Sequence, residues 1–327
     1  QRLAQAQLQA AYETVGVAAE ARKAWFEAVA AQQLVGYFEQ VRDAAEAADT
    51  LARRMLVAGN FSKLAQMREQ AFHADALAQL GRARQQAAAA RERLVRALGH
   101  AGGPQTLKLP ERLPDLPAAP AEAQDVEQTA MARRLDVMMA RQATEATARA
   151  LGLTQATRVV NVLEAGYRNK SATGERLSQG FEVTLELPLF DFGSARLARA
   201  EAVYLQSLHR TAAVAVNARS EVREAHAAYR SAYDLARHYR DELVPLRQRI
   251  SEENLLRYNG MLASVFDLLA DAREQIAAVS GAVEALRDHW IAETQLQAAL
   301  SGRSPGAATA MPSSSPTAAA AAAQSGH

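Results

Sequence analysis

The chain has 327 residues, a formal net charge of +1 and no cysteine. Its 37 basic and 36 acidic residues are mixed along the chain, which leaves no basic surface for nucleic acid, and the missing cysteines exclude disulfides and thiolate metal sites. Aromatic residues make up 6% of an alanine-rich chain, so we expect helices packed closely side by side instead of one large globular core.

Residues 1–99 predict a helical hairpin. Residues 1–56 lack proline, Gly59 and Asn60 mark a turn, and helical sequence resumes from about Ser62 to Leu98. No run here or elsewhere in the chain approaches the roughly 18 apolar residues of a transmembrane helix. We therefore expect antiparallel helices and no helical membrane span.

Residues 100–126 predict an extended strap, because proline at high density prevents helix and favours a segment that lies on another surface. Its prolines are Pro104, Pro110, Pro114, Pro117 and Pro120. Asp125 is a residue type that caps helices, so we expect it to start a helix that runs to about Gln155.

Residues 158–190 predict a β-hairpin. Apolar residues alternate with polar residues or proline from Phe181 to Leu189, and a weaker alternation runs from Val159 to Tyr167. The connection over residues 169–176 is polar and typical of turns. A two-stranded hairpin is not stable by itself, so it must join other strands.

The strand that begins at Phe181 allows two interpretations. In the first it is an amphipathic strand on a soluble core. In the second it is a membrane-barrel strand with one side toward lipid and the other toward a watery lumen. The lipid-facing residues are then Phe181, Val183, Leu185 and Leu187, and the lumen residues are Glu182, Thr184 and Glu186.

Residues 191–257 predict a long helix, and residues 262–301 predict a second helix that returns antiparallel to it. The first carries the heptad seam of a coiled coil, with apolar residues spaced alternately by three and four. The seam residues are Val222, Ala225, Tyr229, Ala232, Ala236, Tyr239, Leu243, Leu246 and Ile250. Pro245 removes the backbone hydrogen bond to Asp241, so we expect a kink there. Residues 303–327, rich in Ser, Pro, Gly and Ala, are expected to be a disordered tail.

The two helical hairpins match each other at a single offset of 201 residues. The pairs are Arg22 with Arg223, Ala24 with Ala225, Ala31 with Ala232, Leu34 with Leu235, Gly59 with Gly260, and Ala76 with Ala277. A gapless register over this length predicts a duplicated hairpin, and so two structural repeats. Because a strand hairpin precedes only the second copy, we expect an equivalent hairpin to be encoded upstream of Gln1, in a longer precursor.

No catalytic or cofactor motif is apparent. No two of the seven histidines stand three or four residues apart, so no helix face offers a pair of metal ligands. The sequence Gly102-Gly103-Pro104 lacks the lysine and the context of a phosphate-binding loop, and no serine stands in a nucleophile elbow. We therefore expect neither an enzyme nor a bound metal or cofactor.

Several motifs together resemble the TolC-type outer-membrane efflux channels, over about residues 1–302. They are Leu187-Pro188-Leu189-Phe190-Asp191-Phe192-Gly193, Tyr258-Asn259-Gly260 with Asp267-Leu268-Leu269, Arg133-Arg134-Leu135-Asp136, and Leu300-Ser301-Gly302. The resemblance implies a homotrimer in the outer-membrane lipid of a Gram-negative bacterium. Each repeat would contribute two strands to a barrel and its helices to a periplasmic tunnel. The implied partners are a periplasmic adaptor protein and an inner-membrane transporter, in a tripartite efflux or type I secretion system.

The resemblance also implies a site at the closed, periplasmic entrance of the tunnel. Tyr258 and Asp267 match the family's entrance tyrosine and first entrance aspartate, whereas the second aspartate falls on Ala270, with Asp271 one position away. Three copies of Asp267 around a three-fold axis would form an acidic ring that selects cations. From spacing alone, the position of Asp267 after the Asn259-Gly260 break favours the other interpretation, an acid in the first turn of a helix.

On this interpretation the protein is a passive conduit, and the transporter determines the substrate. Two other classes compete with it. A periplasmic adaptor also has a long helical hairpin, but adaptors insert that hairpin between many short β segments, and this chain predicts two strands. A soluble structural coiled coil would leave the alternation from Phe181 to Leu189 unexplained.

Overall fold

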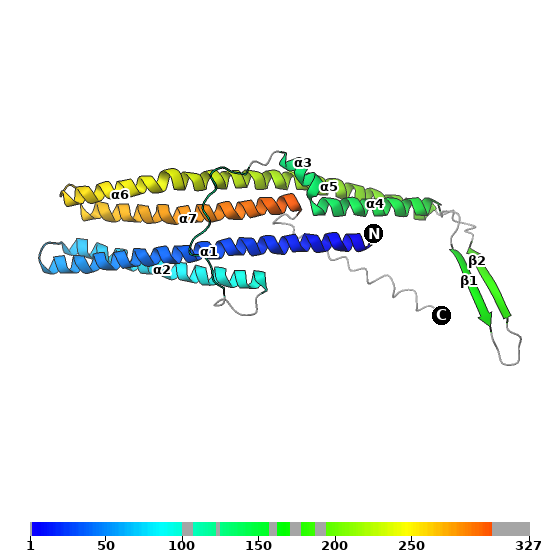
Figure 1. The fold of residues 1–327 in the computed structure, drawn as a ribbon, viewed down its shortest axis with the longest axis horizontal. Helices are drawn as coiled ribbons and strands as arrows, with labels where there is room; N and C mark the ends of the chain where they lie inside the picture. Colours follow the sequence, from blue (N-terminus) through cyan, green and yellow to red (C-terminus); the bar gives the residue numbers. More distant parts are fainter. Residues whose placement is uncertain are drawn as a thin grey trace.

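The computed structural model describes residues 2–99, 107–121, 125–156, 162–170, 178–186 and 194–302. Two long antiparallel helical hairpins lie side by side along the molecule (Figure 1). The first is α1 (Arg2–Val57) with α2 (Lys63–Leu98); the second is α5 (Ser194–His238), η2 (Tyr239–Leu243) and α6 (Val244–Asn259) in succession, with α7 (Val265–Ser301) returning. At about 1.5 Å per residue, the 56 residues of α1 extend about 84 Å. The predicted mainly α architecture of long antiparallel helices is confirmed.

In the sequence, two shorter helices and a strand pair stand between the two hairpins. α3 (Val126–Arg133) and α4 (Leu135–Ala156) pack along α5, and β1 (Val162–Lys170) pairs antiparallel with β2 (Ser178–Glu186) beyond one end of the helices (Figure 1). No helix within the described ranges is long and apolar enough to cross a membrane.

The prediction of one helix capped by Asp125 is wrong. Asp125 has a left-handed backbone, with φ of 52°, and its side chain makes no capping hydrogen bond. The helix is also interrupted at Arg134, whose backbone is extended and whose side chain is 1% exposed. The interruption separates α3 from α4 at the residue whose side chain enters the protein interior.

The tips of the two helical hairpins have the same local structure. Each contains one left-handed residue, Gly59 at φ 75° and Met261 at φ 60°, and the next N–H donates to the carbonyl five residues back. Ser62 and Ser264 then cap α2 and α7, respectively, and each hydroxyl accepts a hydrogen bond from the N–H three residues on. These equivalent positions lie 202 residues apart. The sequence match at 201, which paired Gly59 with Gly260, is therefore one residue short at the tip.

A π-helical turn supplies the additional residue. Before η2, positions 201 apart are buried alike, as in Ala28 with Tyr229 and Val35 with Ala236. Beyond the tips, positions 202 apart are buried alike: Glu69 with Asp271, Ala76 with Ala278, Ala83 with Ala285, Ala90 with Ala292, and Leu94 with Leu296. The N–H of Val244 donates to the carbonyl of Tyr239, five residues back, so this turn holds one residue more than an α-helical turn.

Pro245 explains why the wider turn lies here, since proline has no N–H to offer the carbonyl of Asp241. The predicted kink therefore takes the form of a π-helical turn immediately before the proline. The turn also changes which face of the helix is buried. The predicted seam is buried or partly buried as far as Leu243, but Leu246, beyond the turn, is 47% exposed. Before the turn, Tyr233 is buried as well, although it lies outside the predicted seam.

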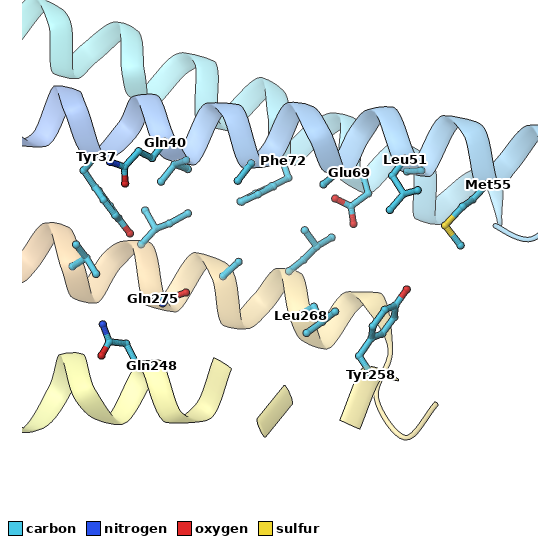
Figure 2. A pocket seen from close by; sticks show the side chains of 18 of the residues that line it. Tyr37, Gln40, Leu51, Met55, Glu69, Phe72, Gln248, Tyr258, Leu268 and Gln275 are labelled. Atoms are coloured by element: carbon cyan, nitrogen blue, oxygen red, sulfur yellow. The ribbon is translucent and has the colours of Figure 1, made fainter. Parts of the chain in front are cut away.

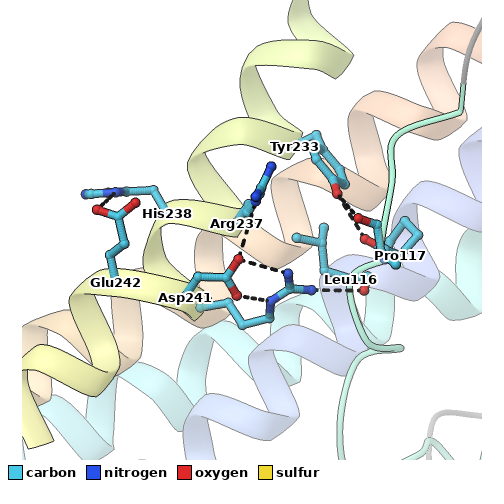
Figure 3. A network of polar contacts seen from close by, with 9 residues as sticks. Leu116, Pro117, Tyr233, Arg237, His238, Asp241 and Glu242 are labelled. Carbon is cyan, nitrogen blue, oxygen red and sulfur yellow. Dashed lines mark hydrogen bonds and ion pairs between the residues drawn. The ribbon is translucent and has the colours of Figure 1, made fainter.

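The strap crosses the helices near mid-length (Figure 1). Within residues 107–121, Leu113 packs between α1 and α7, and Leu116 packs against Tyr233 of α5. Over these described residues the extended backbone of the strap forms no helix or sheet hydrogen bonds, so side chains of the helices bond to its N–H and carbonyl groups. Gln33 accepts a hydrogen bond from Leu113 N–H at 3.1 Å, and Trp290 donates to the carbonyl of Pro114 at 3.0 Å. Arg240 donates to the carbonyl of Leu116 at 3.2 Å. Tyr233 donates to the carbonyls of Pro117 at 3.1 Å and Ala118 at 2.9 Å (Figure 3). The strap thus ties the first helical hairpin to the second.

Candidate functional site

The predicted entrance residues lie at the tip of the second hairpin, where α6 ends and α7 begins. Tyr258 is half-buried on the last turn of α6, and its side chain lines a groove between the two hairpins. Asp267 is exposed in the first turn of α7. The fold therefore brings Tyr258 and Asp267 to the same end of the molecule.

Asp267 forms a capping box with Ser264. Its Oδ2 accepts hydrogen bonds from the backbone N–H and the hydroxyl of Ser264, both at 2.8 Å, and its own N–H donates to Ser264 Oγ at 3.3 Å. The backbone N–H of Ser264, and then its hydroxyl, lower the pKa of Asp267 by stabilising the carboxylate. Asp267 is therefore the helix-start acid that its position suggests, and it stays ionised. A ring of such carboxylates around an axis remains a prediction.

Asp271, the third residue predicted at the tunnel entrance, is buried, whereas Asp267 is exposed. The place of Asp271 at an entrance stays a prediction. Ala270, where the family has its second aspartate, is exposed, whereas Asp271 is 6% exposed. Its Oδ1 is buried and has no hydrogen-bond partner among the residues described. The one-residue difference from the family motif turns the carboxyl group by about 100° around the helix, from the exposed position 270 to the buried position 271.

The predicted barrel residues lie in or beside β2. The backbone of β2 includes Phe181 to Glu186, with Phe181 opposite Tyr167 and Leu185 opposite Leu163. Leu187 lies outside the described residues, as does the tail from 303 to 327. The lipid-facing set of Phe181, Val183, Leu185 and Leu187 and the lumen set of Glu182, Thr184 and Glu186 remain predictions.

A groove between the two hairpin tips was missed by the sequence analysis. It has a volume of about 630 Å³, and its walls come from α1, α2, α6 and α7 (Figure 2). Most of the lining is apolar, but Glu69 of α2 also lines it. Glu69 occupies a buried seam position whose other members are apolar: Ala65, Phe72, Ala76, Leu80 and Ala83. An acid inside an otherwise apolar seam was the signal that could have identified this groove.

Two of the family motifs meet at the start of α4. Arg134 donates to Asp136 Oδ2 and Glu221 Oε2, both at 2.6 Å, and to the carbonyl of Ala299 at 3.1 Å. Gly302 lies against the same backbone at φ 113°, and a Cβ there would be 2.3 Å from the backbone nitrogen of Leu135. The motifs at 133–136 and 300–302 are thus parts of one contact that joins α3, α4, α5 and α7.

No group of three or more His, Asp or Glu side chains that could hold a metal ion occurs in the part of the chain that the structure describes.

No protein-family model matches the sequence, and no curated protein matches it. Solved structures with a similar fold include a membrane protein from Pseudomonas aeruginosa, with a TM-score of 0.77 and 22% identity over 90% of this chain and 70% of that one. VceC, an outer membrane protein of Vibrio cholerae, gives a TM-score of 0.76 and 18% identity over 92% and 73%. The open state of the Neisseria gonorrhoeae outer membrane channel MtrE gives 0.77 and 18% over 91% and 68%. The chain has the TolC-type fold that its motifs predict.

Proposed function

We propose that the chain is the channel component of a tripartite efflux or type I secretion system, a passive conduit from the periplasm to the exterior. One observation carries the proposal. Two helical hairpins with the same local structure at their tips, crossed by a strap near mid-length, share their fold with the outer membrane channel MtrE over 91% of this chain.

The proposed assembly is a homotrimer in the outer membrane of a Gram-negative bacterium. The two hairpins of one chain lie side by side, and three copies would close them into a periplasmic tunnel. The strand pair β1–β2 would enter the outer-membrane lipid. The conduit would hydrolyse nothing itself, and it would take its energy from an inner-membrane transporter reached through a periplasmic adaptor protein.

The tip that carries Tyr258 and Asp267 would be the periplasmic entrance. It lies at the end of the helices opposite the strand pair, which supports this orientation (Figure 1). An ionised Asp267 in each of three subunits would favour cations over anions at a narrow entrance.

Neighbouring residues of β2 provide a matched test. Each of Val183→Lys and Thr184→Lys adds one lysine, but only position 183 is predicted to face lipid. We expect Val183→Lys to reduce recovery of the full-length gene product in the outer-membrane fraction, because a lysine near the bilayer midplane costs about 2–4 kcal/mol. Thr184→Lys should be recovered in the membrane and should conduct ions in a planar bilayer.

Recovery of the unsubstituted full-length product as a detergent-independent soluble protein would contradict the channel proposal and favour the adaptor or the structural coiled coil. Equal recovery of the two lysine variants, with the product in the membrane, would instead contradict the assignment of the two faces of β2. Chemical cross-linking of the membrane fraction tests the trimer separately.

A further inference from the structure

The groove between the hairpin tips has apolar walls on three helices. Val41 of α1, Phe72 of α2 and Ile276 of α7 line it and belong to one hydrophobic cluster. Leu268 lines it farther toward the tip (Figure 2). The amides of Gln40, Gln248 and Gln275 lie toward the end away from Tyr258 (Figure 2). The groove is therefore elongated and mostly apolar, with polar groups at a few defined points. Small-molecule binding sites in proteins usually have this character.

Glu69 is the charged group of this groove. The residue is 5% exposed, and its carboxyl group points from α2 into the space between the hairpins (Figure 2). Its Oε2 has no hydrogen-bond partner within the described part of the chain. A buried carboxylate oxygen without a donor is costly, so this position would be stabilised by a ligand that supplies one.

The neighbouring basic side chains of Arg53 and His73 do not meet this need, because both lie against Asp49 of α1. Arg53 Nη2 lies 2.5 Å from Asp49 Oδ2, and His73 Nδ1 lies 3.8 Å from the same oxygen. Burial, and then the charge of Asp49, raise the pKa of Glu69. The local charge is therefore an excess of acid beside an apolar groove.

We propose that this groove binds a small organic cation, an ammonium with an aromatic or alkyl body. The ammonium N–H groups donate to Glu69 Oε2, and the apolar body lies along Phe72 and Ile276. An ammonium fits better than a metal ion, because the described residues contain no cluster of three metal ligands. The site belongs to the single chain and does not depend on the proposed conduit.

The absence of cysteine allows a direct test of location. A Gln275→Cys substitution places one thiol in the groove, and Ala270→Cys places one on the exposed side of α7 as a control. The chain, purified in amphipol to avoid competing detergent, is treated with a maleimide. The probes are naphthylmethylammonium, the neutral naphthylmethanol and the anionic naphthoate. We expect the ammonium to slow alkylation of the Gln275→Cys variant and not of the Ala270→Cys variant.

The charge preference is tested in the same assay. A charge-assisted hydrogen bond should make the ammonium protect at a concentration about tenfold lower than the alcohol, with naphthoate weakest. When Glu69→Gln is added to the Gln275→Cys variant, the ammonium and the alcohol should protect the thiol at the same concentration. Adding Glu274→Gln, which removes an acid of the same charge from the exposed ion pair with Arg247, should leave the difference unchanged.

Two outcomes would overturn the proposal. In the first, naphthylmethylammonium and naphthylmethanol protect the Gln275→Cys thiol equally although Glu69 is intact. The groove would then bind apolar molecules without any contribution from the charge of Glu69. No protection by any probe, together with disulfide formation between two copies of the Gln275→Cys variant, would assign the groove to contact with a second copy of the chain.

Discussion

The Nη2 atom of Arg134 lies 2.6 Å from Oε2 of Glu221, which joins the start of α4 to the middle of α5. Arg134 is 1% exposed, so its positive charge depends on this partner, on Asp136 and on the carbonyl of Ala299. Desolvation opposes the charged guanidinium, but the two carboxylates outweigh it, and the pKa of Arg134 is raised. The contact is therefore a structural centre of the second repeat.

We predict that Glu221→Leu lowers the free energy of unfolding by about 2 kcal/mol, less than for a fully buried pair because Glu221 is partly exposed. The matched control is Glu127→Leu, which breaks the exposed pair with Arg223 and should cost at most about 1 kcal/mol. Denaturant unfolding of both variants provides the measurement. A loss no greater than that of the control would show that Arg134 is satisfied without Glu221.

A second prediction concerns Gly302, which packs on Leu135 in a left-handed conformation. Gly302→Ala should lower stability by about 1–3 kcal/mol, since the new methyl group overlaps backbone that must move. Gly81→Ala is the matched control, because nothing lies within 4 Å of its added Cβ and it sits inside α2. That substitution should stabilise the chain by about 0.5–1 kcal/mol. Thermal unfolding distinguishes the two, and a stabilising Gly302→Ala would contradict the contact with Leu135.

A third prediction concerns pH and His289, whose ring lies 5.4 Å from that of Tyr229 and 5.6 Å from that of Tyr233. The residue is 1% exposed, neither ring nitrogen has a partner among the described residues, and burial lowers its pKa. The unfolded chain therefore binds a proton first as pH falls. Stability should decrease from about pH 6.5 down through the lowered folded pKa.

His289→Phe should reduce this acid-induced loss of stability, measured as the difference in unfolding free energy between pH 7 and pH 5. His209→Phe changes an exposed histidine of α5 and should preserve the loss. An equal pH dependence in the His289→Phe variant and the unsubstituted chain would show that other groups carry the acid sensitivity.

A fourth prediction separates the two roles of Asp267 in the proposed channel. Ser264→Ala removes the capping hydroxyl and keeps the carboxylate, so it should cost about 1 kcal/mol and leave cation preference unchanged. Asp267→Asn removes the charge, so it should lower cation preference in bilayer recordings of the full-length channel. Because Ser264 lowers the pKa of Asp267, the preference should persist to mildly acidic pH. Unchanged selectivity in the Asp267→Asn channel would leave Asp267 only its role in capping α7.

The positions of the long helices, the strap and the kink could be predicted from the sequence, because each depends on local rules. Proline in the strap cannot continue a helix, and Pro245 cannot donate to Asp241 wherever the helix packs. Ser62 and Ser264 cap helices through their own backbone neighbours. The TolC-type fold followed from motifs spread in order along the chain.

Tertiary structure decided which side chains face inward and what they meet there. The π-helical turn moved the register of the second repeat from 201 to 202 residues, so Asp271 is buried and Glu69 is its equivalent. Asp125 makes no capping hydrogen bond, and Arg134 interrupts the predicted helix at the point where its side chain pairs with Glu221. Periodicity and propensity define the faces of one helix at a time, whereas burial depends on helices brought together from distant parts of the chain.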